Sequence, residues 1–244
     1  MCQCRHINGS ENYMNYRVCC LIIGLLGCAA AADTLTVDVN GNGDYETIQA
    51  AINASSDGDD IQVMPGTYAI PLNEVVNTLG KAIWIYGTDG PDVTIIDGQG
   101  VRGGIACDTG EGSDTIIEGF TIMDGKQDYG AGLYCDGSSP TIIDCIFEGN
   151  NVEERGAALF CDGSSPLIIG CTFRNNNAIK WGGAAYATGG ASPSFDTCLF
   201  ESNAANNGAG LGVFDNEGGS VSLVDCQFLT NTAESGGGAI KGHG

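Results

Sequence analysis

Basic residues are scarce in this sequence. Nine lysines and arginines stand against 30 aspartates and glutamates, so the 244 residues carry a formal net charge of −21 at pH 7. Such a surface repels nucleic acid and anionic lipid, and we expect no nucleic-acid partner. The excess of carboxylates suits a soluble extracellular protein. It could also attract divalent cations, although acidity alone assigns no cation site.

Histidine is almost absent as well. His6 and His243 lie near the two ends of the chain, so the residues between them offer no acid–base pair built on histidine. After residue 32 there is no C-x-x-C motif and no cysteine beside a histidine. This argues against a zinc site. Any catalytic group within the repeats must therefore come from carboxylates, lysine or arginine.

Long apolar runs are also missing. The apolar run at residues 18–26 follows Arg5 and Arg17 and precedes small residues at 27–32. This order is typical of a secretory signal peptide, which we assign to residues 1–32. The run is too short to span a bilayer. We expect an extracellular or cell-surface protein with no transmembrane span in its mature chain, residues 33–244.

Two alternatives for this leader stay open. It could be retained as an anchor helix, or Leu25-Leu26-Gly27-Cys28 could serve as a lipoprotein box in which Cys28 is acylated. If residues 1–32 are removed, seven basic and 29 acidic residues remain, a net charge of −22.

What the sequence does contain is glycine and a repeat. Thirty-nine glycines without a G-X-Y period indicate many tight turns between short strands. Three residue types recur together at intervals of 26, 27 and 28 residues, most clearly over residues 113–244: Cys145, Cys171, Cys198 and Cys226; Phe147, Phe173, Phe200 and Phe228; Asn150, Asn176, Asn203 and Asn231.

This period predicts a β-solenoid with two or three short strands in each coil and about eight coils over residues 33–244. Equivalent residues of successive coils then stack into ladders. We expect the phenylalanines and the cysteines to form inward apolar stacks. We expect the cysteine thiols to stay free, because side chains in register strain the geometry of a disulfide. We expect the asparagines to form a structural ladder at a tight bend that favours the left-handed backbone.

The two ends of the solenoid differ. Residues 44–56 predict a capping helix that begins at Asp44 and buries Ile48, Ala51 and Ile52 on one face. The sequence stops at Gly244 within a repeat, and solenoids need terminal caps. We expect the natural chain to continue, or the open coil to meet a partner.

With these residues placed, the chain resembles the right-handed parallel β-helix, or pectin-lyase-like, superfamily. The segment DYETIQAAINASSDGDDIQVMPGTY resembles the first coil of many such proteins. The strings FEGN, FRNN, FESN and FLTN, each followed by a small-residue turn, resemble the polymorphic outer-membrane protein repeats of surface-exposed bacterial proteins. The resemblance implies an all-β, single-stranded right-handed parallel β-helix. It implies no single function, because the superfamily includes lyases, hydrolases and adhesins.

A lyase of this superfamily would need acidic Ca²⁺ ligands and a basic residue on one face. Asp136 and Asp162 are candidates for Ca²⁺ and for catalysis, because each lies in the string Cys-Asp-Gly-Ser-Ser-Pro, 26 residues apart. Arg155 and Lys180 are candidates for the base. The alternative is that Asp-Gly is repeated turn chemistry and that the cations lie on a solvated loop beside Trp181.

Two functional hypotheses follow. The first is a non-catalytic surface β-helix that contacts polysaccharide or other cell-surface components. The second is a carbohydrate-active enzyme, either a lyase or a hydrolase. The Asn-Thr-Asp and Arg-Ile-Lys strings that mark pectin-type hydrolases do not occur, so we favour the first.

Overall fold

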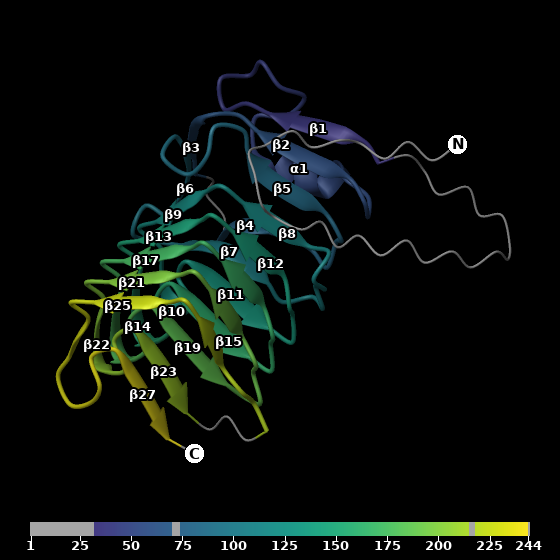
Figure 1. Ribbon diagram of the computed structural model, residues 1–244. Coiled ribbons are helices and arrows are strands. Elements are labelled where there is room, and N and C mark those ends of the chain that lie inside the picture. Colours follow the sequence, from purple (N-terminus) through teal and green to yellow (C-terminus); the bar gives the residue numbers. More distant parts are fainter. Residues whose placement is uncertain (1–31, 70–73, 215–217, 244) are drawn as a thin grey trace, which may run out of the picture. The chain divides into compact units, whose positions relative to one another are not determined.

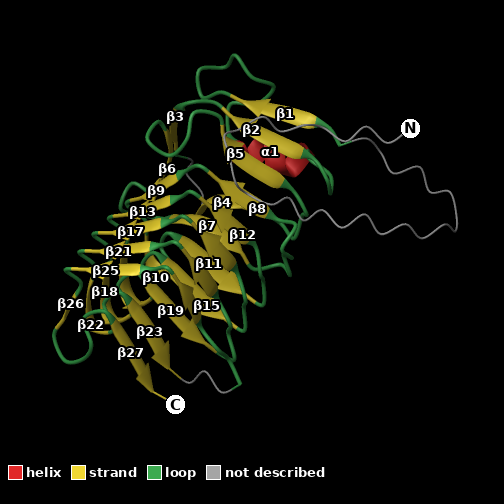
Figure 2. Cartoon of the chain, in the orientation of Figure 1, coloured by secondary structure: helices red, strands yellow, loops and turns green. Residues whose placement is uncertain are grey.

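The computed structural model describes residues 32–69, 74–214 and 218–243. The predicted signal peptide lies outside the described residues except for Ala32, and the lipoprotein prediction at Cys28 lies outside them entirely. Residues 32–244 form one compact unit, in which β-strands stack in four parallel sheets (Figure 1 and Figure 2).

Each sheet collects one strand from successive coils, and we name the sheets A to D. Sheet A contains β1 (Thr34–Val37), β2 (Asp60–Val63), β5 (Trp84–Gly87), β8 (Ile116–Glu118), β12 (Thr141–Ile143), β16 (Leu167–Ile169), β20 (Ser194–Asp196) and β24 (Ser222–Val224). Sheet B contains β3 (Gly66–Tyr68), β6 (Thr94–Asp97), β9 (Thr121–Met123), β13 (Ile146–Glu148), β17 (Thr172–Arg174), β21 (Leu199–Glu201) and β25 (Gln227–Leu229).

The other two sheets complete the coil. Sheet C contains β4 (Glu74–Asn77), β7 (Gly103–Cys107), β11 (Leu133–Asp136), β15 (Leu159–Asp162), β19 (Ala185–Thr188), β23 (Leu211–Phe214) and β27 (Ile240–His243). Sheet D contains β10 (Lys126–Tyr129), β14 (Asn151–Arg155), β18 (Asn177–Trp181), β22 (Ala204–Asn207) and β26 (Thr232–Ala233).

The eight strands of sheet A mark eight coils. The predicted all-β parallel solenoid of about eight coils is therefore confirmed. The prediction of two or three strands per coil is wrong for the later coils, where the chain passes through sheets A, B, D and C in turn and forms four strands.

The core contains a column of phenylalanine rings in sheet B. Phe147, Phe173, Phe200 and Phe228 pair in register, and their ring centroids lie 5.0, 4.9 and 4.5 Å apart with nearly parallel planes. The spacing follows from the distance between neighbouring strands, about 4.8 Å. The first three rings are fully buried, so the column contributes apolar burial in each coil.

The asparagines form a hydrogen-bonded ladder at the corner between sheets B and D. The side-chain amides of Asn150, Asn176 and Asn203 each donate to the Oδ1 atom of the next asparagine, at 2.9 to 3.0 Å. The left-handed backbone, however, lies one residue earlier in the turn, for example at Gly149 and Asn175. The ladder asparagines therefore supply hydrogen bonds rather than unusual φ angles.

Two cysteine ladders line the interior. One contains Cys145, Cys171, Cys198 and Cys226, which follow the strands of sheet A. The other contains Cys107, Cys135 and Cys161, which pair in register in sheet C. All seven are free, and all except the half-buried Cys226 are buried. Burial raises the pKa of the Cys171 thiol, and its neighbour Cys145 raises it further, so these thiols behave as small apolar groups.

The helix near the N-terminal end is shorter than predicted. Helix α1 spans Ile48–Ala54 instead of residues 44–56, and its N-cap is Thr47, whose hydroxyl accepts from the Ala50 amide. Asp44 does not cap it, because its carboxylate accepts hydrogen bonds from the amide and hydroxyl of Thr36. Helix α1 packs against β1, β2 and β4. That it seals the coil stack stays a prediction.

Two further observations concern membranes and the C-terminal end. Among the described helices, none is long and apolar enough to cross a membrane. The last strand, β27, ends at His243. The expectation of further coils or a partner beyond Gly244 stays a prediction.

Candidate functional site

Asp136 and Asp162 lie in register on β11 and β15 of sheet C. The cysteines that precede them are buried, so the alternation of side chains along a strand turns both carboxylates outward. Asp108 follows Cys107, which pairs with Cys135, and therefore occupies the same row one coil earlier. The structure thus aligns three carboxylates on consecutive coils, one more than the sequence predicted.

The repeated Cys-Asp-Gly-Ser-Ser-Pro string has a structural explanation in the turn from sheet C to sheet A. Gly137 and Gly163 adopt φ angles of 58° and 56°, which favour glycine. The serines that follow them, Ser138 and Ser164, are fully buried, and the Ser138 amide donates to the Ser164 hydroxyl at 3.1 Å. Turn geometry and this serine ladder are sufficient to account for the string.

The same turn depends on a buried carboxylate that the sequence did not identify. Glu111 accepts hydrogen bonds from the hydroxyls of Thr78 and Ser138, at 2.6 and 2.7 Å, and from two backbone amides. Burial alone would raise the pKa of Glu111, but these hydrogen bonds lower it below its ordinary value. Glu111 therefore stays ionised as a structural clamp.

The fit of Asp136 and Asp162 to Ca²⁺ is poor. Ca²⁺ takes six to eight oxygen ligands, whereas the structure brings only a row of separate carboxylates to this surface. Within residues 32–69, 74–214 and 218–243, no group of three or more His, Cys, Asp or Glu side chains is arranged to hold a metal ion. Ca²⁺ binding at Asp136 and Asp162 stays a prediction.

The two candidate bases have other partners. The Arg155 guanidinium lies over the Tyr186 ring, 5.3 Å from its centroid, and donates to the Tyr186 hydroxyl at 3.1 Å. Lys180 forms an ion pair with Glu154. Among the described residues, neither cation pairs with Asp136 or Asp162.

Beside the carboxylate row lies a set of packed rings that we call the aromatic strip: Tyr129, Tyr134, Phe160, Trp181 and Tyr186. The Tyr134, Phe160 and Tyr186 rings stack in register across β11, β15 and β19, with centroids 5.5 and 5.9 Å apart. Tyr129 and Trp181, at the ends of β10 and β18, pack against Phe160 at 5.1 Å and Tyr186 at 6.5 Å.

The aromatic strip has a buried centre and an accessible rim. Phe160 and Tyr186 are 6% and 1% exposed, whereas Tyr129 is 38% exposed and Tyr134 and Trp181 are half-buried. Burial raises the pKa of the Tyr134 hydroxyl, and the carboxylates of the neighbouring row raise it further. The strip and the carboxylate row therefore form one surface.

Of this strip, the sequence pointed only to Trp181, beside the candidate bases. A usable signal was present, because Tyr134 and Phe160 each precede an inward cysteine and must therefore point outward. Their spacing of 26 residues places them on neighbouring coils. Tyr129 carries no such signal, since its strand is polar.

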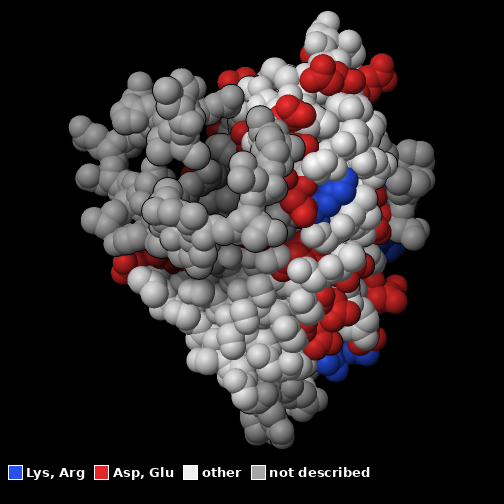
Figure 3. Space-filling model, turned by 90° about the vertical axis from the view of Figure 1, so that its right-hand side faces the viewer, with Lys and Arg blue, Asp and Glu red and all other residues white. Residues whose placement is uncertain are grey.

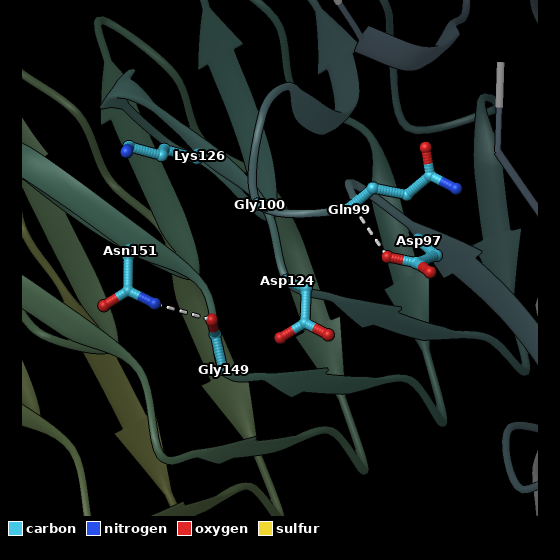
Figure 4. Close-up of a pocket in the computed structure, with 8 residues that line it drawn as sticks. Asp97, Gln99, Gly100, Asp124, Lys126, Gly149 and Asn151 are labelled. Carbon is cyan, nitrogen blue, oxygen red and sulfur yellow. Dashed lines mark hydrogen bonds between the residues drawn. The ribbon is translucent and has the colours of Figure 1, made fainter. Parts of the chain in front are cut away.

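An open hollow of about 440 Å³ lies where sheet D begins. Figure 4 shows the residues that line it, among them the Asp97 and Asp124 carboxylates, with Lys126 on the opposite side from Asp97. Partial burial raises the pKa of the Asp124 carboxyl, and the negative charges of Asp97 and Glu148 raise it further. The sequence did not predict this hollow.

A second hollow, of about 370 Å³, adjoins the first. The two share Gly100 and Lys126, and the second continues along β10 and β14 to Asp128 and Glu153. The linings are acidic: Asp97, Asp124, Asp128 and Glu153 accompany Lys126, the one cation among the described lining residues. Carboxylates also outnumber basic side chains on another face of the molecule, the one that Figure 3 displays.

Comparison with known proteins supports the fold. The model of a family described as the right handed beta helix region matches residues 37–200. Comparison with curated proteins gives no match.

Proposed function

Because the chain belongs to the right-handed β-helix family, we propose that it is an exported or cell-surface protein that binds polysaccharide without cleaving it. Export rests on the signal peptide predicted for residues 1–32. Binding rests on the aromatic strip, whose accessible rim lies beside a row of carboxylates.

The physical basis is the match between this surface and a sugar. Aromatic rings present flat apolar faces, and a tyrosine adds a hydroxyl at its edge. A sugar ring has an apolar face lined with C–H groups and a rim of hydroxyls. Rings of Tyr129 and Trp181 can pack against such a face, while Asp136 and Asp162 accept hydrogen bonds from the hydroxyls.

A carbohydrate-active enzyme is the second candidate, and one observation favours it. Asp97 and Asp124 line the same hollow, and the raised pKa of Asp124 is a property of general acids in glycoside hydrolysis. The lyase version has less support, because its candidate bases Arg155 and Lys180 are bound to Tyr186 and Glu154.

The test is a binding assay with residues 33–244 on a panel of neutral, amino and acidic polysaccharides. We expect retention on at least one polysaccharide, and we expect Tyr129→Ala combined with Trp181→Ala to weaken it about tenfold or more. Tyr86→Ala, at a half-buried tyrosine of sheet A, is the matched control. Binding to no polysaccharide would contradict the proposal.

The same samples test for turnover, with and without Ca²⁺. Reducing ends report hydrolysis, and the ultraviolet absorbance of unsaturated sugars reports lyase activity. Turnover abolished by Asp124→Asn would establish the hydrolase. Turnover that depends on Ca²⁺ and on Asp162 would establish the lyase.

A further inference from the structure

The two hollows and the aromatic strip are connected by strand β10. This strand begins at Lys126, which lines both hollows, and ends at Tyr129, whose ring packs on Phe160 of the strip. Strand β14 runs beside it in parallel and contributes Glu153 to the second hollow. Strand β10 therefore extends from the hollows beside sheet B to the aromatic strip beside sheet C.

The first hollow exists because of the way sheet D begins. Strand β10 is the first strand of the sheet, and the preceding coil passes this corner as a turn at residues 98–102. Two of the lining glycines, Gly100 and Gly149, contribute no side chains to fill the space. At Gly100 a Cβ atom would meet nothing within 4 Å.

The polar groups along this surface are of two kinds. Four carboxylates line the hollows, those of Asp97, Asp124, Asp128 and Glu153, and one cation, Lys126, lies between them. In the part of the chain that the structure describes, Lys126 forms no ion pair. Carboxylates accept hydrogen bonds from hydroxyl and amino groups, and their excess over cations repels a ligand that carries carboxylates of its own.

We propose that the two hollows and the aromatic strip form one groove, which binds a linear polysaccharide without acidic groups. The polysaccharide lies along β10 and β14, across the axis of the solenoid. One sugar occupies the hollow at Asp97 and Asp124, and another packs against Tyr129. The inference rests on the proposed carbohydrate binding and adds to it the ligand class and the path. The volume of the first hollow falls in the range of small-molecule sites.

The experiment is calorimetric titration of residues 33–244 with oligosaccharides of increasing length. The probes are derived from cellulose, xylan, mannan and chitosan, with oligogalacturonides as the acidic counterpart. We expect affinity to rise with length until the ligand spans the distance from the hollow to the strip, and oligogalacturonides to bind at least tenfold more weakly.

Variants at both ends of the groove locate the ligand. Asp124→Asn keeps a side chain that tolerates the left-handed backbone of Asp124, φ 50°, and removes the charge that strengthens its hydrogen bonds. We expect it to weaken the longest binding oligosaccharide about tenfold while leaving the shortest ones that reach only Tyr129 unchanged. Lys126 lines both hollows, and we expect Lys126→Ala to weaken binding of the longest oligosaccharide as well. Asp114→Asn, at an exposed aspartate, is the matched control.

Two results would overturn the groove while leaving carbohydrate binding intact. One is loss of binding in Tyr129→Ala with full affinity in both Asp124→Asn and Lys126→Ala. The other is tighter binding of oligogalacturonides than of all other probes. If no probe binds, the proposed function fails together with the groove.

Discussion

At the scale of single residues, neighbouring asparagines have opposite roles. Asn176 is fully buried and its amide donates to the Phe147 carbonyl and the Asn203 Oδ1 atom, both at 2.9 Å, while its own Oδ1 accepts from Asn150. Asn177, the next residue, is exposed. The sequence shows three consecutive asparagines at residues 175–177, but only the register of the coil decides which one belongs to the ladder.

We expect Asn176→Ala to lower the free energy of unfolding by about 3 kcal/mol, because buried donors and acceptors on the adjacent coils would lose their partners. Urea unfolding followed by circular dichroism measures the change. Asn177→Ala is the control and should change stability by less than about 0.5 kcal/mol. Equal effects of the two substitutions would show that the ladder adds no stability.

At the scale of elements, the Glu111 clamp connects loops from three coils. Its carboxylate binds Thr78, Thr109 and Ser138. The pKa of Glu111 is lowered in the folded chain. The stability that the ionised Glu111 carboxylate contributes to the fold is therefore fully present above the unfolded-state pKa, about 4.3. This contribution is lost as the pH falls through the lower folded-state pKa.

We therefore expect Glu111→Gln to cost about 2 kcal/mol at pH 7, since hydrogen bonds to a charged acceptor are the stronger ones. The difference from the unsubstituted protein should shrink as the pH falls below about 4. Urea unfolding at a series of pH values measures both effects. The exposed Glu46 provides the control as Glu46→Gln. A difference that stays constant with pH would show that the charge of Glu111 is not the stabilising feature.

The elements differ in how far the sequence predicted them. Strands of sheet A were predictable, because runs such as Thr141–Ile143 and Leu167–Ile169 are apolar and β-branched. The strands of sheet D were missed. Strands β14 and β18 each bury one residue fully, Val152 or Ala178, so no alternating pattern marks them. The predicted start of α1 at Asp44 was wrong, because the Asp44 carboxylate accepts hydrogen bonds from Thr36 instead of capping the helix.

At the scale of the whole molecule, the candidate site depends on stacking that the sequence shows only indirectly. Tyr134, Phe160 and Tyr186 come together because coils of equal length bring them into register. The hollow depends on where sheet D begins, and that boundary follows from a turn at residues 98–102 with no motif of its own. The sequence therefore predicted the repeat and its ladders better than the surface that the repeat displays.

The net charge of −22 on residues 33–244 has a consequence for the stability of the whole solenoid. Carboxylates repel one another over roughly 30 Å at 0.01 M salt but only about 10 Å at 0.1 M, so salt relieves repulsion that opposes the folded state. Little attraction is lost in exchange, because the described residues contain two ion pairs, Glu148 with Arg174 and Glu154 with Lys180. Screening should therefore stabilise the protein.

We expect the melting temperature of residues 33–244 to rise by roughly 2–4 °C between 0.01 and 0.2 M NaCl, which corresponds to about 1 kcal/mol for a chain of this size. Calorimetric scans measure it, with KCl as the control for ion identity. A fall with NaCl would mean that attractive pairs outweigh the repulsion. CaCl₂ at equal ionic strength separates screening from binding: a larger rise that Asp162→Asn removes would assign a Ca²⁺ site to the carboxylate row, whereas an equal rise would leave screening as its whole effect.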